Sequence, residues 1–119
     1  MKEDNPIVEK SKAFAIRIIN LYKYLKDEKK EYVLSKQVLK SGTSVGANVR
    51  EAARAQSKAD FISKQSIALK EADETCYWLE LLHETAFVGD IEFNSIYADA
   101  NELVKLLVAI IKAAKTATD

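Results

Sequence analysis

The chain has 119 residues, the size of a single domain whose folding buries about two-thirds of the surface that the unfolded chain exposes. Three glycines, one proline and long segments rich in Ala, Leu, Lys and Glu are typical of helices, so we predict an all-α fold. One cysteine and one histidine exclude an internal disulfide and a Cys/His zinc site.

The net charge is zero, but the two halves of the chain carry opposite charge. Residues 1–58 hold 13 basic and 7 acidic side chains, whereas residues 59–119 hold 5 basic and 11 acidic ones. Such an asymmetry indicates either a basic surface for an acidic partner or two halves that attract each other.

The N-terminal residues are polar and lack the apolar core of a signal peptide. The longest apolar run, residues 106–111, is too short to cross a bilayer. We therefore expect a cytoplasmic protein with no membrane partner.

The first predicted helix spans residues 6–26. Asn5 can cap it, and proline suits the first helical position at Pro6. An apolar stripe with helical spacing follows, formed by Ile7, Phe14, Ile18, Leu21 and Leu25. Residues 27–31 have no periodic apolar position, so we predict a solvated connection there.

The second predicted helix spans residues 36–55. Ser35 can cap it, with Leu34 and Leu39 placed as a hydrophobic staple. Gly42 and Gly46 inside the helix each cost about 1 kcal/mol relative to alanine. We therefore predict that a neighbouring helix approaches closely at this stretch.

Small and polar residues follow one side of the second helix at helical spacing. Buried polar groups need hydrogen-bond partners, so these residues predict a polar seam between helices, with a carboxylate accepting bonds from serine, asparagine or Arg17. The predicted seam consists of Gln37, Ser41, Ser44, Asn48 and Glu51, together with Glu74 of the third helix.

The third and fourth predicted helices span residues 58–87 and 92–116. Ser57 can cap the third helix, Asp60 suits its first turn, and Gly89 can stop it. In residues 103–111 of the fourth helix only Lys105 is charged, so nearly the whole circumference is apolar. One face can pack in the core, and the rest would leave an exposed apolar patch.

This excess of apolar surface predicts a homo-oligomer, held together by the fourth helix and part of the first. The candidate interface residues are Trp78, Leu106, Val108 and Ile111. Four helices with short connections predict a single domain over residues 1–119, folded as an antiparallel up-down-up-down four-helix bundle.

With the helices placed, the chain resembles the bacterial four helix bundle protein family. The resemblance lies in Ser-Gly-Thr-Ser-Val-Gly-Ala-Asn-Val-Arg-Glu at 41–51, in Ala-Leu-Lys-Glu-Ala-Asp-Glu-Thr-Cys-Tyr-Trp-Leu at 68–79, in Phe-Ile at 61–62 and in Phe-Ala-Ile-Arg at 14–17. Members of this family were first noticed as open reading frames in intervening sequences of large-subunit ribosomal RNA genes.

The resemblance implies a left-handed bundle that assembles as a ring-shaped homopentamer, and it implies little biochemistry. A related branch, the accessory variability determinant of diversity-generating retroelements, binds a reverse transcriptase and nucleic acid through a strongly basic surface. This chain differs from that branch because it is neutral overall.

A basic stripe on the second helix is the candidate binding surface. Helical spacing brings its four cations near one line, where they could neutralise phosphates of RNA or DNA or bind a protein partner. The alternative is a solvated face, or charges matched by acidic helices of the same or an adjacent subunit. The stripe consists of Lys36, Lys40, Arg50 and Arg54.

A metal-dependent enzyme using Glu51, Glu74 and His83 is a third hypothesis. Glu80 and His83 have the Glu-x-x-His spacing of di-metal bundles, but such sites need two of these elements and the chain has a single histidine. Cys76 lies beside the core stripe without a histidine to activate it, as expected of an apolar filler. We therefore predict no enzyme, cofactor or metal, and a scaffold or interaction module as the leading function.

Overall fold

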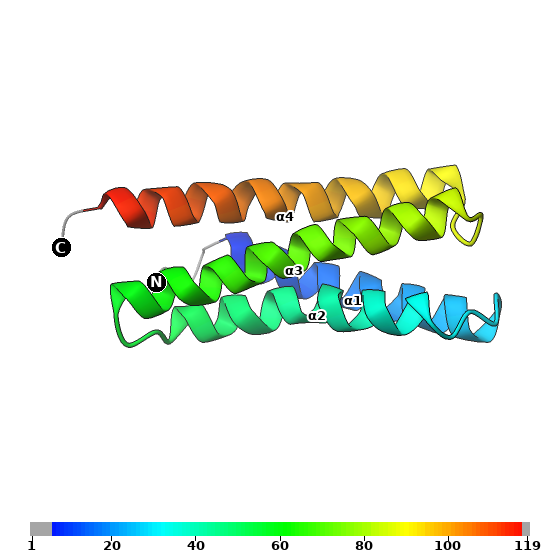
Figure 1. Cartoon of the computed structure of the whole chain (residues 1–119), viewed down its shortest axis with the longest axis horizontal. Helices are drawn as coiled ribbons and strands as arrows, with labels where there is room; N and C mark the ends of the chain where they lie inside the picture. Colours follow the sequence, from blue (N-terminus) through cyan, green and yellow to red (C-terminus); the bar gives the residue numbers. More distant parts are fainter. Residues whose placement is uncertain (1–5, 118–119) are drawn as a thin grey trace.

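The computed structural model describes residues 6–117, and within them the chain forms four helices and no strand. The helices alternate in direction and lie side by side along a body about 50 Å long (Figure 1). They are α1 (Pro6–Asp27), α2 (Leu34–Ala53), α3 (Lys58–Glu84) and α4 (Asp90–Thr116). Each helix packs against the next one in the chain, and α4 returns beside α1. The predicted antiparallel four-helix bundle is confirmed.

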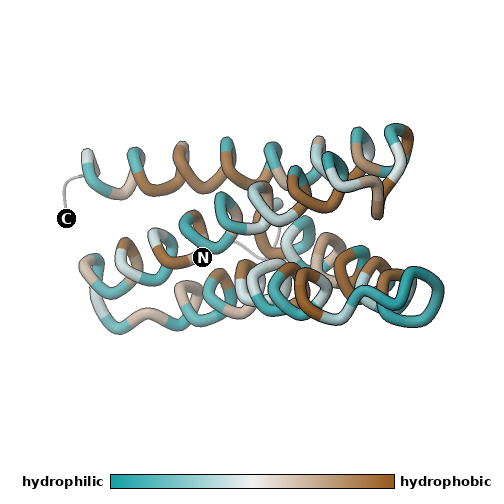
Figure 2. Tube along the Cα trace, turned by 45° about the vertical axis from the view of Figure 1, so that its right-hand side comes forward, coloured by the Kyte–Doolittle hydropathy of each residue, from teal (hydrophilic) through white to brown (hydrophobic). Residues whose placement is uncertain are grey.

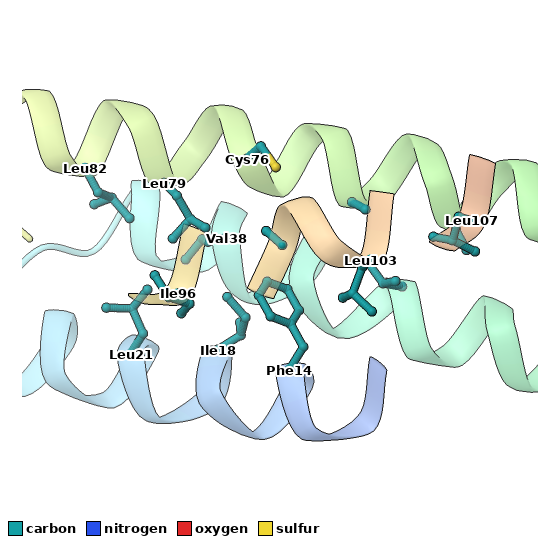
Figure 3. Packing of buried hydrophobic residues seen from close by; sticks show 14 of the residues in the cluster. Phe14, Ile18, Leu21, Val38, Cys76, Leu79, Leu82, Ile96, Leu103 and Leu107 are labelled. Atoms are coloured by element: carbon teal, nitrogen blue, oxygen red, sulfur yellow. The ribbon is translucent and has the colours of Figure 1, made fainter. Parts of the chain in front are cut away.

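One contiguous hydrophobic core runs along the bundle axis, and the helical stripes of all four helices point into it (Figure 3). Phe14 and Ile18 of α1 meet Leu79 of α3 and Leu103 of α4 in its centre. Each fully buried leucine or isoleucine contributes about 1.5–3 kcal/mol relative to an exposed one. The stripe of α1 is buried as predicted over its whole length.

The glycines of α2 allow a close approach of α1. A Cβ atom on Gly42 would lie 2.7 Å from Cγ1 of Ile18, whose side chain is fully buried. A Cβ atom on Gly46 would lie 3.4 Å from the carbonyl oxygen of Ser11, which is an ordinary contact distance. Both glycines lie inside a continuous helix, so the predicted close contact exists and its partner is α1.

The start of α2 differs from the sequence prediction. The carboxylate of Glu31 accepts hydrogen bonds from the backbone N–H groups of Leu34, at 3.0 Å, and Ser35, at 2.7 Å. The Ser35 hydroxyl instead donates to the carbonyl oxygen of Glu31 at 2.7 Å. The negative carboxylate satisfies the free amides of the first turn, so the helix begins two residues earlier than predicted and Ser35 is not its cap.

Ser57 caps α3 as predicted, accepting a hydrogen bond from the backbone N–H of Asp60. The predicted stop at Gly89 is wrong, because α3 ends at Glu84 and Gly89 caps the start of α4 with a φ of −77°. The chain turns at Ala86, whose φ is +67°. The backbone N–H groups of the next two residues then donate to the carbonyl oxygen of Leu82.

The burial of the two residues that follow Ala86 compensates for its unfavourable backbone conformation. Val88 is buried in the core cluster, and Phe87 packs against it. Packing these two apolar side chains at the end of the core offsets the strain of an alanine in the left-handed conformation, which costs about 1–2 kcal/mol.

The two glycines of α2 should respond differently to alanine. Gly42→Ala should destabilise the protein by about 1–3 kcal/mol, because its Cβ atom would overlap the buried Ile18 side chain. Gly46→Ala, the matched control, should be neutral or stabilise by up to about 1 kcal/mol, because alanine favours the helix and its Cβ atom fits. Urea unfolding of both variants measures this. Equal destabilisation would contradict the close approach at Gly42.

Candidate functional site

The seam between α2 and α3 contains one buried polar contact. The Thr75 Oγ1 atom lies 2.8 Å from Oγ of Ser41 and 2.7 Å from the carbonyl oxygen of Glu71 in its own helix. Both hydroxyl-bearing residues are almost completely buried. The two hydroxyls satisfy each other inside the core, so this contact fixes the register of α2 against α3 and has no access to a substrate.

Three other residues of the predicted seam on α2 do not cross to α3. Gln37 is exposed. The Ser44 hydroxyl donates to the carbonyl oxygen of Lys40 at 2.7 Å, and the Asn48 amide donates to the carbonyl oxygen of Ser44 at 2.9 Å. These half-buried side chains find partners one turn back in their own helix, a common local solution for short polar side chains.

The two carboxylates of the predicted seam lie at the surface. Glu51 is exposed and lies 3.7 Å from the ammonium group of Lys64 on α3. Glu74 is exposed and accepts a hydrogen bond from the indole N–H of Trp78 at 3.2 Å. The structure therefore corrects the predicted seam: the buried hydrogen bond between α2 and α3 joins Ser41 to Thr75, which was not among the predicted seam residues.

Arg17 pairs with α4 and not with the predicted carboxylates. Its guanidinium group lies 2.9 Å from the Asp99 carboxylate and 3.0 Å from the Glu92 carboxylate. Lys10 lies 3.0 Å from Glu102 one step further along the same seam. Ion pairs between half-exposed groups contribute about 0–1 kcal/mol each. They link the first helix to the last one.

Gln65 is the buried polar group that sequence reasoning did not single out. It is completely buried in α3, and within residues 6–117 neither its amide nitrogen nor its amide oxygen has a hydrogen-bond partner. A buried unpaired amide costs about 1–3 kcal/mol. The sequence signal for its burial is its helical spacing with the apolar residues Ala68, Ala72 and Leu79 of α3.

Cys76 is buried beside the α3–α4 seam, where its sulfur lies 3.8 Å from Oδ1 of Asn101. Burial, together with the negative charges of Asp73 and Glu80, raises the pKa of the thiol to about 11. A thiol with such a pKa is protonated at neutral pH, so Cys76 lacks the thiolate that a nucleophile needs.

Two further polar pairs join α3 to α4 and the start of that helix. The Tyr97 hydroxyl donates to Glu80 at 2.5 Å, and this bond, followed by burial, raises the tyrosine pKa to about 12. His83 Nε2 lies 2.7 Å from Asp90 Oδ1, and its ring stacks on Phe93. The two residues of the Glu-x-x-His motif, Glu80 and His83, therefore bind different residues of α4 and do not meet at a common site. Among the described residues no group of three or more His, Cys, Asp or Glu side chains could hold a metal ion.

A surface groove between α1 and α4 has a volume of about 520 Å³. Its apolar floor includes Leu21 and Val88, and Arg17 and Glu92 stand at its rim. The guanidinium group of Arg17 already has two carboxylate partners. Among the described residues, the lining of this groove includes no cysteine, serine, threonine or histidine, so it offers no thiol, aliphatic hydroxyl or imidazole group.

The predicted basic stripe lies on the outer face of α2. All four of its cations are exposed, and none forms an ion pair with another described residue. Their charge is therefore uncompensated within the part of the chain that the structure describes. The stripe consists of Lys36, Lys40, Arg50 and Arg54.

The four candidate interface residues differ in exposure. Val108 exposes 48% of its surface on α4, and Leu106 and Trp78 are half-buried against the core cluster. Ile111 is only 8% exposed, and it lines an apolar surface hollow together with Val108 and Leu69 of α3. The helical spacing places it on the buried face with Leu107.

Both the sequence and the fold of this chain match those of known proteins. The sequence model of the 23S rRNA-intervening sequence protein family matches residues 3–109. The chain belongs to this family. A crystal structure of a protein with unknown function from the S23 ribosomal protein family, from Bacteroides thetaiotaomicron VPI-5482, shares 58% sequence identity with a TM-score of 0.88. The match covers 89% of this chain and 98% of that chain.

The family match confirms the resemblance found in the sequence. Comparison with curated proteins gave no significant match. None of the described helices of this intervening sequence protein is long and apolar enough to cross a membrane.

The Cys76 thiol should react slowly with a disulfide reagent. At pH 8 a thiol of pKa about 11 has about 100-fold less thiolate than one with the ordinary pKa of about 9. We expect the native protein to react with Ellman's reagent at least about 100-fold more slowly than the urea-unfolded chain. Similar rates in the two states would contradict the buried, protonated thiol.

Proposed function

We propose that this protein is a non-enzymatic scaffold of the cytoplasm that works by self-association, as a homopentameric ring. Exposed apolar side chains on the outer faces of the bundle support the proposal. Ile16 of α1 is 53% exposed, Tyr77 of α3 is 54% exposed, and Val108 of α4 is 48% exposed. Burying such side chains between copies is favourable at about 25 cal/mol per Å² of apolar area.

The distribution of apolar residues explains this exposure. Figure 2 shows that hydrophobic residues recur along most of α4, with hydrophilic positions between them. The core uses one face of α4, including Leu103 and Leu107, and Val108 remains outside it. Ile16 and Ile19 likewise lie outside the buried stripe of α1. Interfaces between identical chains are richer in apolar area than the rest of a protein surface.

Light scattering after size-exclusion chromatography tests this function. At micromolar concentration the mass should be about five times the 13.3 kDa of one chain. The double variant Tyr77→Glu, Val108→Glu should have a lower mass, because two charges would be buried in the interface. Asn94→Glu, at an exposed position on α4, serves as the control and should leave the mass unchanged.

Circular dichroism would show that the variants keep their helices. A monomeric wild-type protein, or a double variant with the wild-type mass, would contradict this proposal. A stable oligomer with a different number of subunits would contradict the pentamer alone.

A second candidate function is supported by the unpaired cations of α2. Under it, the protein is an accessory factor whose basic stripe binds RNA, DNA or a nucleic-acid enzyme. Four phosphate contacts to single-stranded RNA predict that the affinity falls about 50-fold between 50 and 200 mM salt.

Fluorescence anisotropy with a labelled single-stranded RNA tests this function. Replacing Lys36, Lys40, Arg50 and Arg54 by glutamine should abolish binding and its salt dependence. The control variant with Lys23, Lys29, Lys105 and Lys112 replaced by glutamine removes the same charge elsewhere and should bind like the wild type. No binding at 50 mM salt would exclude this function for RNA, and a DNA probe would extend the test.

A further inference from the structure

The second half of α3 carries an acidic surface without cation partners. Residues 71–84 contain five carboxylates and neither lysine nor arginine. Asp73, Glu74 and Glu84 are exposed, and none of them forms an ion pair with another described residue. The acidic residues of α4 differ in this respect, because Glu92 and Asp99 are neutralised by α1.

An exposed aromatic side chain lies within this acidic surface. Tyr77 is 54% exposed, and its ring packs at 5.2 Å, tilted by 55°, on Trp78. The Trp78 indole is in turn held by Glu74. Tyrosine and tryptophan are enriched in protein–protein interfaces, where they often contribute most of the binding energy. We name this surface, formed by Asp73, Glu74, Tyr77 and Glu84, the acidic strip.

The neighbouring helix α2 carries exposed lysines, but they point away from the acidic strip of the same chain. The antiparallel arrangement places the first half of α2 beside the second half of α3 (Figure 1). Lys36 and Lys40 nevertheless form no ion pair across this seam, where Lys64 and Glu51 are paired near its other end. Helical spacing directs both lysines to the side of α2 away from its buried stripe. One chain therefore presents two uncompensated surfaces of opposite sign.

We propose that the acidic strip of one copy docks on the basic stripe of the next copy. This inference rests on the proposed self-association and identifies the surfaces that meet in it. A second copy is the occupant because it offers the opposite charge on a surface long enough to cover the acidic strip. At 1.5 Å per residue the acidic strip is about 16 Å long, and the basic stripe, from residue 36 to residue 54, is about 27 Å long.

The two surfaces are different, so the contact is heterologous and each copy uses both of them. The outer faces of adjacent helices in a four-helix bundle differ in direction by about 90°. Successive copies with parallel axes would therefore turn in one sense and close a ring of about four or five subunits. Lys36 and Lys40 would be covered in this ring, so a polyanion and the neighbouring copy would compete for them.

Charge reversal tests the docking. The variant Asp73→Lys, Glu84→Lys and the variant Lys36→Glu, Lys40→Glu should each reduce the oligomer to monomer in light scattering at 150 mM salt. The chain that carries all four substitutions should regain the wild-type mass, because both surfaces have changed sign. Lys23→Glu, Lys29→Glu is the control with an equal change in charge and should keep the wild-type mass.

A second measurement uses the unaltered protein. Raising NaCl from 50 mM to 1 M should dissociate the wild-type oligomer, since exposed ion pairs are screened at high salt. A wild-type monomer at low salt would overturn the proposed self-association and this docking with it. An oligomer that survives both reversals, or is not restored by the fourfold variant, would overturn the docking and leave self-association standing. RNA bound by the intact oligomer without dissociating it would overturn the shared use of the lysines.

Discussion

The packing of Ile18 against Gly42 determines how closely the first hairpin of the bundle closes. The missing side chain at Gly42 leaves a space that the β-branched Ile18 fills completely. This contact sets the spacing of α1 and α2, and α2 in turn contacts α3 through the Ser41 and Thr75 hydroxyls. The core is close-packed, so a displacement at the glycine would be transmitted to the polar contact and to α3.

The architecture could be predicted from the sequence because the apolar stripes are long and regular. The stripe from Ile7 to Leu25 is buried without exception, and Gly42 marks a close approach of α1 to α2. The helix ends were harder to predict, because each depends on a competition between local groups. At the start of α2, Glu31 and not Ser35 satisfies the free backbone amides, because its carboxylate accepts hydrogen bonds from two of them at once.

The candidate site could be predicted less well, for two physical reasons. Helical spacing gives the direction of a side chain, but short polar side chains such as Ser44 and Asn48 can bond to their own backbone instead of a neighbour. Charged partners far apart in sequence, such as Arg17 and Asp99, have no pattern that links them. The four cations of the basic stripe are exposed, but their helical spacing does not identify what binds them.

The α1–α4 seam has a consequence for how the bundle moves. These two helices make the fewest contacts of the four neighbouring pairs and are linked by ion pairs at Lys10 and Arg17 beside an open groove. Local opening events begin where few apolar contacts oppose them. Transient separation of α1 from α4 should therefore be the local opening of lowest free energy. It would expose Phe14 and Leu103 to water more often than α2 separates from α3.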